Sequence, residues 1–424
     1  MKIQIRSKLN INNNMFKTSL ALTSGRVFNM FVSFVLLLIQ SRFIGPEITG
    51  KVAYFAIPVG YLWILTLGIP SALARELPYY LAKDEREKAL LYAQTAQSFS
   101  IVMGLLCSIG FVILAIISFF RGNYFYAMGW AFQVISAFFA IYNSYILTLY
   151  RTTDEFIKVA KASALSAVTR IVVFPLIFVS PYVGLFMKSI SNDISTNTYL
   201  YWKRPFKFKF GFDIRIFYDL LQFGMPLIII GYIEANLWTS AQATMIVRMA
   251  DTTQLGLYNF INQIMLLLLI IPNVVSEVLR PKFATVYGQT NGSLKKVLKT
   301  SIMPLSITFT FSLIAVFLSW LFIGDIVSWL LPKYVDAIPA LEIALLLVPV
   351  MTIKTIKYMF VVTKSMKYNV LSTLPGFLLG LGMLYFILSN DINFKYIFLP
   401  YILGQLLNFF ISVFILFFQV RKEA

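Results

Sequence analysis

Histidine is absent from the 424-residue sequence, and cysteine occurs once, at Cys107. Without histidine the chain lacks the commonest general base, proton shuttle and transition-metal ligand of proteins. One cysteine excludes an intrachain disulfide and a paired-cysteine metal or redox motif. Any catalysis would therefore rest on carboxylates, lysine or a supplied cofactor.

Charge is also scarce. Asp, Glu, Lys and Arg make up 13% of the residues and hydrophobic residues 59%, whereas a soluble domain has about 25% charged and about 45–50% apolar residues. The composition therefore predicts a polytopic membrane protein. The net charge of +18 does not indicate a nucleic-acid-binding protein, because long apolar runs separate the basic residues.

A membrane-spanning helix needs about 20 mostly apolar residues, and the sequence offers twelve such segments. They lie at 18–44, 52–74, 91–118, 123–149, 163–180, 182–202, 217–246, 257–279, 300–323, 338–362, 370–389 and 396–419. The segment 182–202 is the least apolar, since the polar run Lys188–Asn197 lies within it. The charges between the segments decide whether it crosses the membrane.

Most basic residues outside the spans lie on one side of the predicted membrane. If the N-terminus lies inside, the outer connections carry only Lys51, Arg121, Arg248, Lys333 and Lys395. The termini, the inner connections and the inner ends of the spans carry most of the other bases, as the positive-inside rule requires, and Lys357, near the inner end of the 338–362 span, is counted among them. Omitting the 182–202 span would invert everything after it. We therefore expect this span to be real, its polar face to point inward and both termini to be cytoplasmic.

The two halves of the sequence show a faint repeat. Arg42 stands eight residues before Gly50, and Arg248 stands eight residues before Gly256, with 206 positions between the two pairs. Six spans in each half give both halves the same orientation, related by an axis along the membrane normal. We expect an N-terminal lobe at 1–202, a basic inter-lobe linker at 203–216 and a C-terminal lobe at 217–424.

Ionisable residues within spans cost about 2.5–3.5 kcal/mol each on insertion scales and are functional candidates by default. Four bases and four acids qualify: Arg26, Arg42, Arg170, Lys188, Asp193, Glu234, Glu277 and Glu342. Arg26 and Arg170 either line a cavity or snorkel to the interface as anchors. Arg42, at an outer span end, is an interfacial anchor or a phosphate or sugar contact. Glu277 and Glu342 lie nearer span ends and are interpreted as structural.

Lys188 begins a polar stripe that continues with Asn192, Ser195 and Tyr199 at helical spacing. Such a stripe cannot face lipid, so it lines a cavity or packs between helices. Asp193 lies off the stripe and is placed to partner another helix. We assign the cavity role to Arg26, Arg42, Arg170, Lys188 and Asn192.

Glu234 is the deepest acid of the second half. It is a coupling-ion site, a salt-bridge gate with one of the bases, or a structural residue. Asn259, Asn262 and Gln263 form another inward polar row, suited to sugar hydroxyls or to helix association. We add this row to the substrate-binding candidates and assign coupling or gating to Asp193, Glu234 and Arg248.

Four segments carry a family resemblance, beginning with RFIGPEITGKVAYFAIPVGYLWILTLGIPSALARELP at 42–78. The others are LLQFGMPLIIIGY, QLGLYNFINQIMLLLLIIPNVVSEVLRPKFA and LLPKYVDAIPALEIALLLVP, at 220–232, 254–284 and 330–349. Together they resemble polysaccharide flippases of the multidrug/oligosaccharidyl-lipid/polysaccharide exporter superfamily. The resemblance implies an all-α protein with two six-helix lobes, pseudo-twofold related, around a central cavity.

The same resemblance implies a transporter of the bacterial inner membrane, not an enzyme. Its substrate would be an undecaprenyl-pyrophosphate-linked oligosaccharide, a repeat unit of O-antigen lipopolysaccharide, capsule or exopolysaccharide, flipped outward by alternating access. Membrane lipids, a glycan polymerase and glycosyltransferases are the implied partners. No cofactor, metal or catalytic residue is expected, and H⁺, Na⁺ and the membrane potential stay open as driving forces.

Two other functions stay open. A multidrug exporter of the same superfamily would prefer an aromatic, acid-lined pocket, whereas acids and bases are balanced within these spans. A membrane glycan polymerase or ligase would need a sizeable external catalytic loop, and the external connections here are short. The sequence therefore favours the flippase.

Overall fold

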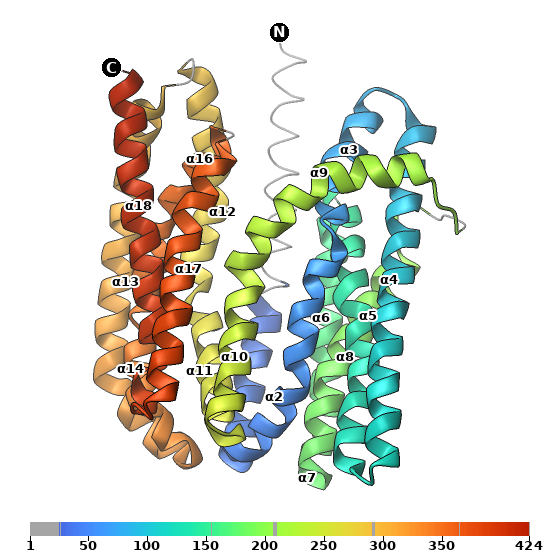
Figure 1. The fold of residues 1–424 in the computed structure, drawn as a ribbon, viewed down its shortest axis with the longest axis vertical. Coiled ribbons are helices and arrows are strands. Elements are labelled where there is room, and N and C mark those ends of the chain that lie inside the picture. Colours follow the sequence, from blue (N-terminus) through green and yellow to red (C-terminus); the bar gives the residue numbers. More distant parts are fainter. Residues whose placement is uncertain are drawn as a thin grey trace. The chain divides into compact units, whose positions relative to one another are not determined.

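The computed structural model describes Gly25 and residues 27–153, 155–206, 210–290, 293–363 and 365–423. Within these residues every predicted span is mostly helical, with short turns inside some spans, as at Leu67–Gly68, and no strand occurs (Figure 1). Eight of the described helices are long and apolar enough to cross a membrane, and the helix Val27–Phe43 is apolar but shorter. The chain is therefore an all-α, multi-pass membrane protein, as predicted.

Residue contacts divide the chain into two compact units. Unit 1 comprises the residues up to Gln40 and Phe55–Leu237, and unit 2 comprises Ser41–Tyr54 and Trp238–Ala424. The chain therefore changes unit within the helix Val27–Phe43, within α2 (Pro46–Tyr61) and at the end of the π-helical turn η2 (Ile233–Leu237). These divisions differ from the lobe boundaries expected at 203 and 217, which stay a prediction about the repeat.

Unit 1 is a bundle of long helices joined by short connections. In Figure 1, α4 and α5 run side by side, and α8 packs against α5 and α6. After the helix Val27–Phe43 and the second half of α2, the elements are η1 (Leu62–Thr66), α3 (Ile69–Ala82), α4 (Arg86–Phe120), α5 (Tyr124–Thr152), α6 (Phe156–Val173), α7 (Leu176–Val179), α8 (Pro181–Trp202), α9 (Ile214–Tyr232) and η2.

The core of unit 1 lies where α3, α4 and α5 meet. Leu73, Leu77 and Tyr145 are almost fully enclosed there. The Tyr150 hydroxyl donates to the backbone carbonyl of Leu200 at 2.7 Å, which ties α5 to the end of α8. Buried tyrosine hydroxyls need such a partner, so this hydrogen bond fixes the position of the polar helix α8.

The expectation for the 182–202 span is confirmed as far as its helix is concerned. α8 is a 22-residue helix, Pro181–Trp202. It is not among the helices that meet the length and apolarity criteria for a span, which agrees with its polar sequence. Its polar residues instead contact other helices of unit 1, as the functional site described below shows.

Unit 2 contains the first half of α2 and the second half of the chain. Many of its helices are interrupted by short helical turns. They are α10 (Trp238–Met249), α11 (Thr252–Leu268), α12 (Ile270–Gln289), α13 (Leu294–Leu330), η3 (Pro332–Ala337), α14 (Ile338–Ala344), α15 (Leu347–Ile353), η4 (Lys354–Tyr358), α16 (Met359–Val362), α17 (Met366–Ser389), η5 (Phe394–Tyr396) and α18 (Leu399–Glu423).

The repeat seen in the sequence becomes a physical contact inside unit 2. A Cβ atom on Gly50 would lie 1.7 Å from the carbonyl oxygen of Thr252, and one on Gly256 would lie 1.8 Å from that of Pro46. Pro46 and Thr252 are separated by the same 206 positions as the two glycines. The crossing of α2 and α11 is therefore reciprocal, and only glycine permits such close backbone approach.

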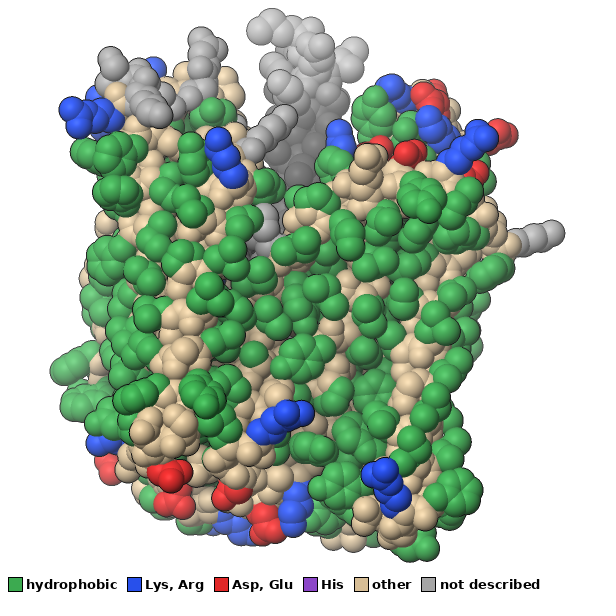
Figure 2. Space-filling model, viewed as in Figure 1, with side chains coloured by type: hydrophobic (Ala, Val, Ile, Leu, Met, Phe, Trp, Pro, Cys, Tyr) green, Lys and Arg blue, Asp and Glu red, His purple; other side chains and the backbone are tan. Residues whose placement is uncertain are grey.

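The surfaces of both units suit a membrane. Hydrophobic side chains cover the middle of the visible face, and charged side chains gather near the helix ends (Figure 2). Phe120, Phe311 and Trp329 are examples of large apolar side chains left exposed by the chain itself. Such extensive apolar exposure would be a liability in water and is expected against lipid.

Candidate functional site

Arg170 forms the centre of a polar cluster in unit 1. It lies in the last turn of α6 and is half-buried. Its Nη1 donates to the Ser33 hydroxyl at 2.8 Å, its Nη2 to Asn29 Oδ1 at 2.5 Å and its Nε to the Ser166 carbonyl at 3.3 Å. Asn29 in turn donates to the Ser163 carbonyl and the Ser166 hydroxyl at 2.7 and 2.8 Å. Neutral groups thus hold the guanidinium between α6 and the helix Val27–Phe43.

Lys188 is held in the same way. Its ammonium donates to Gln40 Oε1 at 2.5 Å, which links α8 to the helix Val27–Phe43. Lys188 lies within electrostatic reach of Arg170, so the two positive charges repel each other. Among the described residues neither forms an ion pair with a carboxylate. We call Arg170, Lys188 and their partners Asn29, Ser33 and Gln40 the cationic cluster.

The acid of this region lies elsewhere on α8. The Asp193 carboxylate accepts from Asn192 Nδ2 at 3.3 Å and lies near the Ser136 side chain on α5. On the predicted stripe itself, the Thr169 hydroxyl of α6 donates to Ser195 Oγ at 3.0 Å. The stripe thus faces α6 and the helix Val27–Phe43, while Asp193 contacts α5. The inward orientation of the polar face of α8 is confirmed.

Arg42 lies in unit 2 and contacts backbone. Its Nη1 donates to the carbonyls of Leu330 and Trp329, at 3.0 and 3.5 Å. In the reverse direction, Lys333 Nζ donates to the Phe43 carbonyl at 2.6 Å. Each base therefore caps the C-terminus of a helix that it does not belong to, where positive charge is favourable. These contacts agree with the anchoring interpretation, and the substrate-binding role predicted for Arg42 stays a prediction.

The second polar row also lies in unit 2. Asn259 and Gln263 on α11 are half-buried and have no hydrogen-bond partner among the described residues. Asn262 is half-buried on the same helix, where the Tyr258 hydroxyl donates to Gln242 Oε1 of α10 at 3.0 Å. Arg248 is exposed in the last turn of α10, and Glu342 is half-buried in α14. The roles predicted for these residues stay predictions.

Three of the predicted ionisable residues cannot be placed in full. Arg26 lies outside the described residues, and the side chains of Glu234 and Glu277 are outside the described part of their helices. The backbone of Glu234 belongs to the π-helical turn η2. Such turns are rare and frequently mark functional positions.

The sequence reasoning missed the partners of the two cations, although a signal was present. Asn29, Ser33 and Gln40 follow one another at steps of four and seven residues in the first span. These steps place all three on one face of a helix. This polar row in an otherwise apolar span was therefore the signal that the first span supplies the hydrogen-bond partners of Arg170 and Lys188.

Lys357 corrects one sequence interpretation. The charge pattern counted it among the bases of a connection, but the structure buries it to 6% exposure in η4, where it donates to the Thr373 hydroxyl.

Buried polar residues of α17 and α18 lie in the same unit. Among the described residues the side-chain oxygens of Asn369, Gln405 and Asn408 accept no hydrogen bond. Unit 2 thus has a polar interior that hydropathy alone did not reveal.

Comparison with protein families gives one match. The model of the family described as polysaccharide biosynthesis protein matches residues 15–287, well over half of the chain. The chain belongs to this family. The match covers the whole cationic cluster and the crossing of α2 and α11. No curated protein matches the chain by sequence.

Solved structures of MOP-superfamily transporters share the fold of this family member. One is a multidrug resistance MATE-family transporter in an inward-facing conformation, with a TM-score of 0.77 and 15% identity over 93% of this chain and 95% of that one. An outward-facing MATE-family structure has a TM-score of 0.66 and 16% identity over 96% of each chain. A MOP-superfamily transporter from Pyrococcus furiosus, whose title reports a binding pocket of reverse polarity, has a TM-score of 0.66 and 14% identity over 96% of each chain.

Proposed function

We propose that the chain is a transporter that flips a polyprenyl-pyrophosphate-linked oligosaccharide from the inner to the outer leaflet by alternating access. The observation that carries the proposal is the cationic cluster of unit 1. In the part of the chain that the structure describes, Arg170 and Lys188 are held by amides, a hydroxyl and a carbonyl and pair with no carboxylate, so their positive charge is oriented without being neutralised. A resident carboxylate would compete with a phosphate for the same donors.

The donors of the cluster are not exhausted. A guanidinium has five N–H donors and an ammonium three. Arg170 directs three hydrogen bonds to protein, and Lys188 directs one. Counted over the described residues, each cation therefore keeps two donors for a ligand. Charge-assisted hydrogen bonds to phosphate are about twice as strong as neutral ones, which suits this cluster to a pyrophosphate.

The family supplies the second support, since its name concerns polysaccharide biosynthesis. A membrane protein of such a family that has a transporter fold would be expected to move a glycan intermediate across the membrane. The half-buried amides Asn259 and Gln263 have the chemistry for sugar hydroxyls. O-antigen, capsule and exopolysaccharide repeat units all satisfy this chemistry, in a bacterial inner membrane with both termini inside.

The membrane potential is the driving force that the substrate charge favours. Moving about two negative charges outward across 100 mV, inside negative, releases about 4.6 kcal/mol, because each charge contributes about 2.3 kcal/mol. In proteoliposomes we expect a valinomycin-imposed potassium potential, negative inside, to accelerate outward flipping. An equal rate at zero potential would contradict this driving force.

The test of the proposed function is a flipping assay in proteoliposomes with a fluorescent polyprenyl-pyrophosphate glycan. Arg170→Ala and Lys188→Ala should each lower the flipping rate at least tenfold, the effect of losing about 1.5 kcal/mol of charge-assisted hydrogen bonding. Lys161→Ala is the matched control. Lys161 is an exposed cation of the same helix, nine residues before Arg170 and hence on its opposite face.

Two results would contradict the proposal. Wild-type protein that flips no glycan lipid but exports a cationic dye would point to a multidrug exporter. Deletion of the gene offers an independent readout. If the protein is a flippase, lipid-linked repeat units should accumulate on the inner leaflet of the deletion strain. If the units instead face outward but stay unpolymerised in that strain, the protein would be a polymerase.

A further inference from the structure

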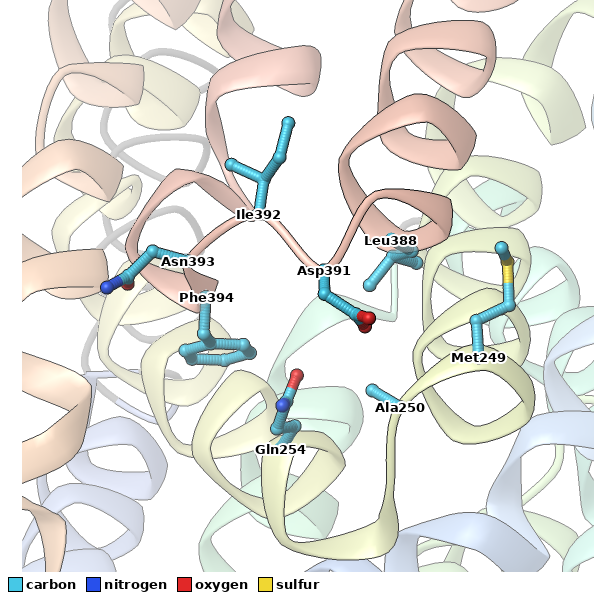
Figure 3. Close-up of a pocket in the computed structure, with 8 residues that line it drawn as sticks. All are labelled: Met249, Ala250, Gln254, Leu388, Asp391, Ile392, Asn393 and Phe394. Atoms are coloured by element: carbon cyan, nitrogen blue, oxygen red, sulfur yellow. The ribbon is translucent and has the colours of Figure 1, made fainter.

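Unit 2 contains a pocket that the cationic cluster does not explain. It has a volume of about 400 Å³ and lies between the α10–α11 connection and the segment from the end of α17 to η5 (Figure 3). This volume is within the range of small-ligand sites, about 300–1,000 Å³. The positive-inside pattern places both connections on the outer side of the membrane.

Two polar side chains face this pocket from different elements. In Figure 3 the Asp391 carboxylate and the Gln254 carboxamide point into a common space, with the Phe394 ring at its border. Neither polar side chain has a hydrogen-bond or ion-pair partner among the described residues. Asn393 points away, because its Oδ1 accepts from the backbone N–H of Lys395 at 2.9 Å. Met249 and Leu388 supply apolar wall.

The composition of the pocket selects the class of ligand. A carboxylate among the lining residues and the lack of a lining base disfavour an anion. One carboxylate is too few for a metal site, and the described residues hold no group of three potential metal-binding side chains. A wholly apolar ligand would leave two polar groups desolvated. A neutral sugar ring fits all three constraints, since it offers hydroxyl donors to Asp391 and Gln254 and a C–H face to Phe394.

The backbone at Asp391 offers a way to test this assignment. Asp391 follows the C-cap of α17 with φ +51°, and the next N–H, of Ile392, donates to the Ile387 carbonyl at 3.0 Å. This left-handed position normally favours glycine. The same turn occurs after α3, where Asp84 has φ +62° and the Glu85 N–H donates to the Tyr80 carbonyl at 3.0 Å. The chain thus offers a second aspartate in the same conformation, in a turn that is not part of this pocket.

We propose that this pocket binds a neutral pyranose unit of the transported glycan at the outer end of unit 2. The choice of a glycan rests on the proposed function, but binding of the sugar to the pocket is measured separately from flipping. Asp391 accepts a sugar hydroxyl in a charge-assisted hydrogen bond, Gln254 contacts a second hydroxyl, and Phe394 packs against the ring.

The experiment is saturation-transfer NMR on the purified full chain in nanodiscs, with glucose, galactose, N-acetylglucosamine and their disaccharides as probes. At least one probe should receive saturation from wild-type protein. Asp391→Gly should weaken binding at least tenfold without loss of thermal stability, because glycine suits the backbone at this position. Phe394→Leu should weaken binding several-fold.

Asp84→Gly is the matched control, since it makes the same chemical change in the same turn, and it should leave binding unchanged. The proposal is overturned if no probe binds wild-type protein, if Asp391→Gly and Asp84→Gly behave alike, or if calcium alone displaces the sugar from the pocket. Flipping separates the two claims. Protein that binds sugar but flips nothing contradicts only the proposed function, and protein that flips normally with an unresponsive pocket contradicts only this inference.

Discussion

Each unit places one lysine in a polar interior, and the two lysines differ in what surrounds them. Lys188 of unit 1 is half-buried, donates to Gln40 and lies within electrostatic reach of a second cation. Lys357 of unit 2 is only 6% exposed and donates to Thr373. The comparison separates a cation that is accessible to a ligand from one that is enclosed by its own helices.

The difference shows that an intramembrane charge is not by itself a binding site. Such a residue is a functional candidate by default, but only one with donors left over and an accessible surface can bind a substrate. Unit 1 satisfies both conditions at Arg170 and Lys188. In unit 2 the enclosed Lys357 is better suited to holding η4 against α17, and the ligand site that we propose for this unit is the pocket at Asp391.

The largest expected effect concerns stability and tests this assignment of Lys357. Lys357→Ala should lower the free energy of unfolding by about 2–4 kcal/mol, because it opens a cavity and removes a buried hydrogen bond. The measurement is thermal unfolding of purified protein followed by size-exclusion chromatography. Lys188→Ala should change stability by less than about 1 kcal/mol. Equal destabilisation by the two variants would remove the distinction between the lysines.

The next effect concerns charge compensation in the cationic cluster. Gln40→Glu should lower the flipping rate about tenfold or more, because the new carboxylate pairs with Lys188 and competes with phosphate for its donors. Stability should stay the same or rise. Gln263→Glu, which adds a carboxylate in unit 2, serves as the control in the same assay. Normal flipping by Gln40→Glu would mean that the charge of Lys188 is not used.

A smaller effect is expected from the residue that positions Arg170. Asn29→Ala removes an acceptor for Nη2 but leaves the charge, so flipping should fall about three- to tenfold, the equivalent of roughly 1 kcal/mol for a neutral hydrogen bond. The apparent affinity for the glycan lipid should weaken, while the amount of folded protein stays near that of wild type. Full activity of Asn29→Ala would show that the guanidinium needs no such support.

The smallest effect is expected from the amide oxygens of unit 2. Asn408 Oδ1 is buried and accepts no hydrogen bond among the described residues. Asn408→Ala should therefore change the free energy of unfolding by less than about 1 kcal/mol, since losing an unpaired buried acceptor offsets the lost packing. Thermal unfolding measures this directly. A loss comparable to that of Lys357→Ala would indicate that the oxygen has a bound partner such as an ordered water.

Much of the fold could be predicted because a membrane helix is visible in the sequence as a run of about 20 mostly apolar residues. Hydropathy identified most of the helical segments, and the segment 182–202, kept because of loop parity, is a helix, although its crossing of the membrane stays a prediction. The face of that helix was also predictable, because Lys188 and Ser195 follow helical spacing and do contact neighbouring helices.

The rest depended on tertiary packing, which spacing along the chain does not record. Lys357 resembled a loop base because the segment around it is mixed in polarity, and only the packing of η4 against α18 and the hydrogen bond of Lys357 to Thr373 of α17 show its burial. The pocket at Asp391 combines segments about 140 residues apart. Division of the chain inside α2 was equally hidden, because a continuous helix gives no sign that its halves pack with different partners.

The reciprocal capping of two helix ends in unit 2 has a consequence for biosynthesis. Arg42 and Lys333 bind the carbonyls of Leu330 and Phe43, so residues separated by 288 and 290 positions must meet. At a synthesis rate of about 5–20 residues per second, the segment around Arg42 waits about 15–60 s before its partners emerge. For the earlier part of that interval, until Thr252 is made, Gly50 also lacks its crossing with α11. Residues 41–54 must therefore stay in the membrane without their unit 2 partners, and a factor that shelters them until Lys333 has been made would raise the yield of folded protein.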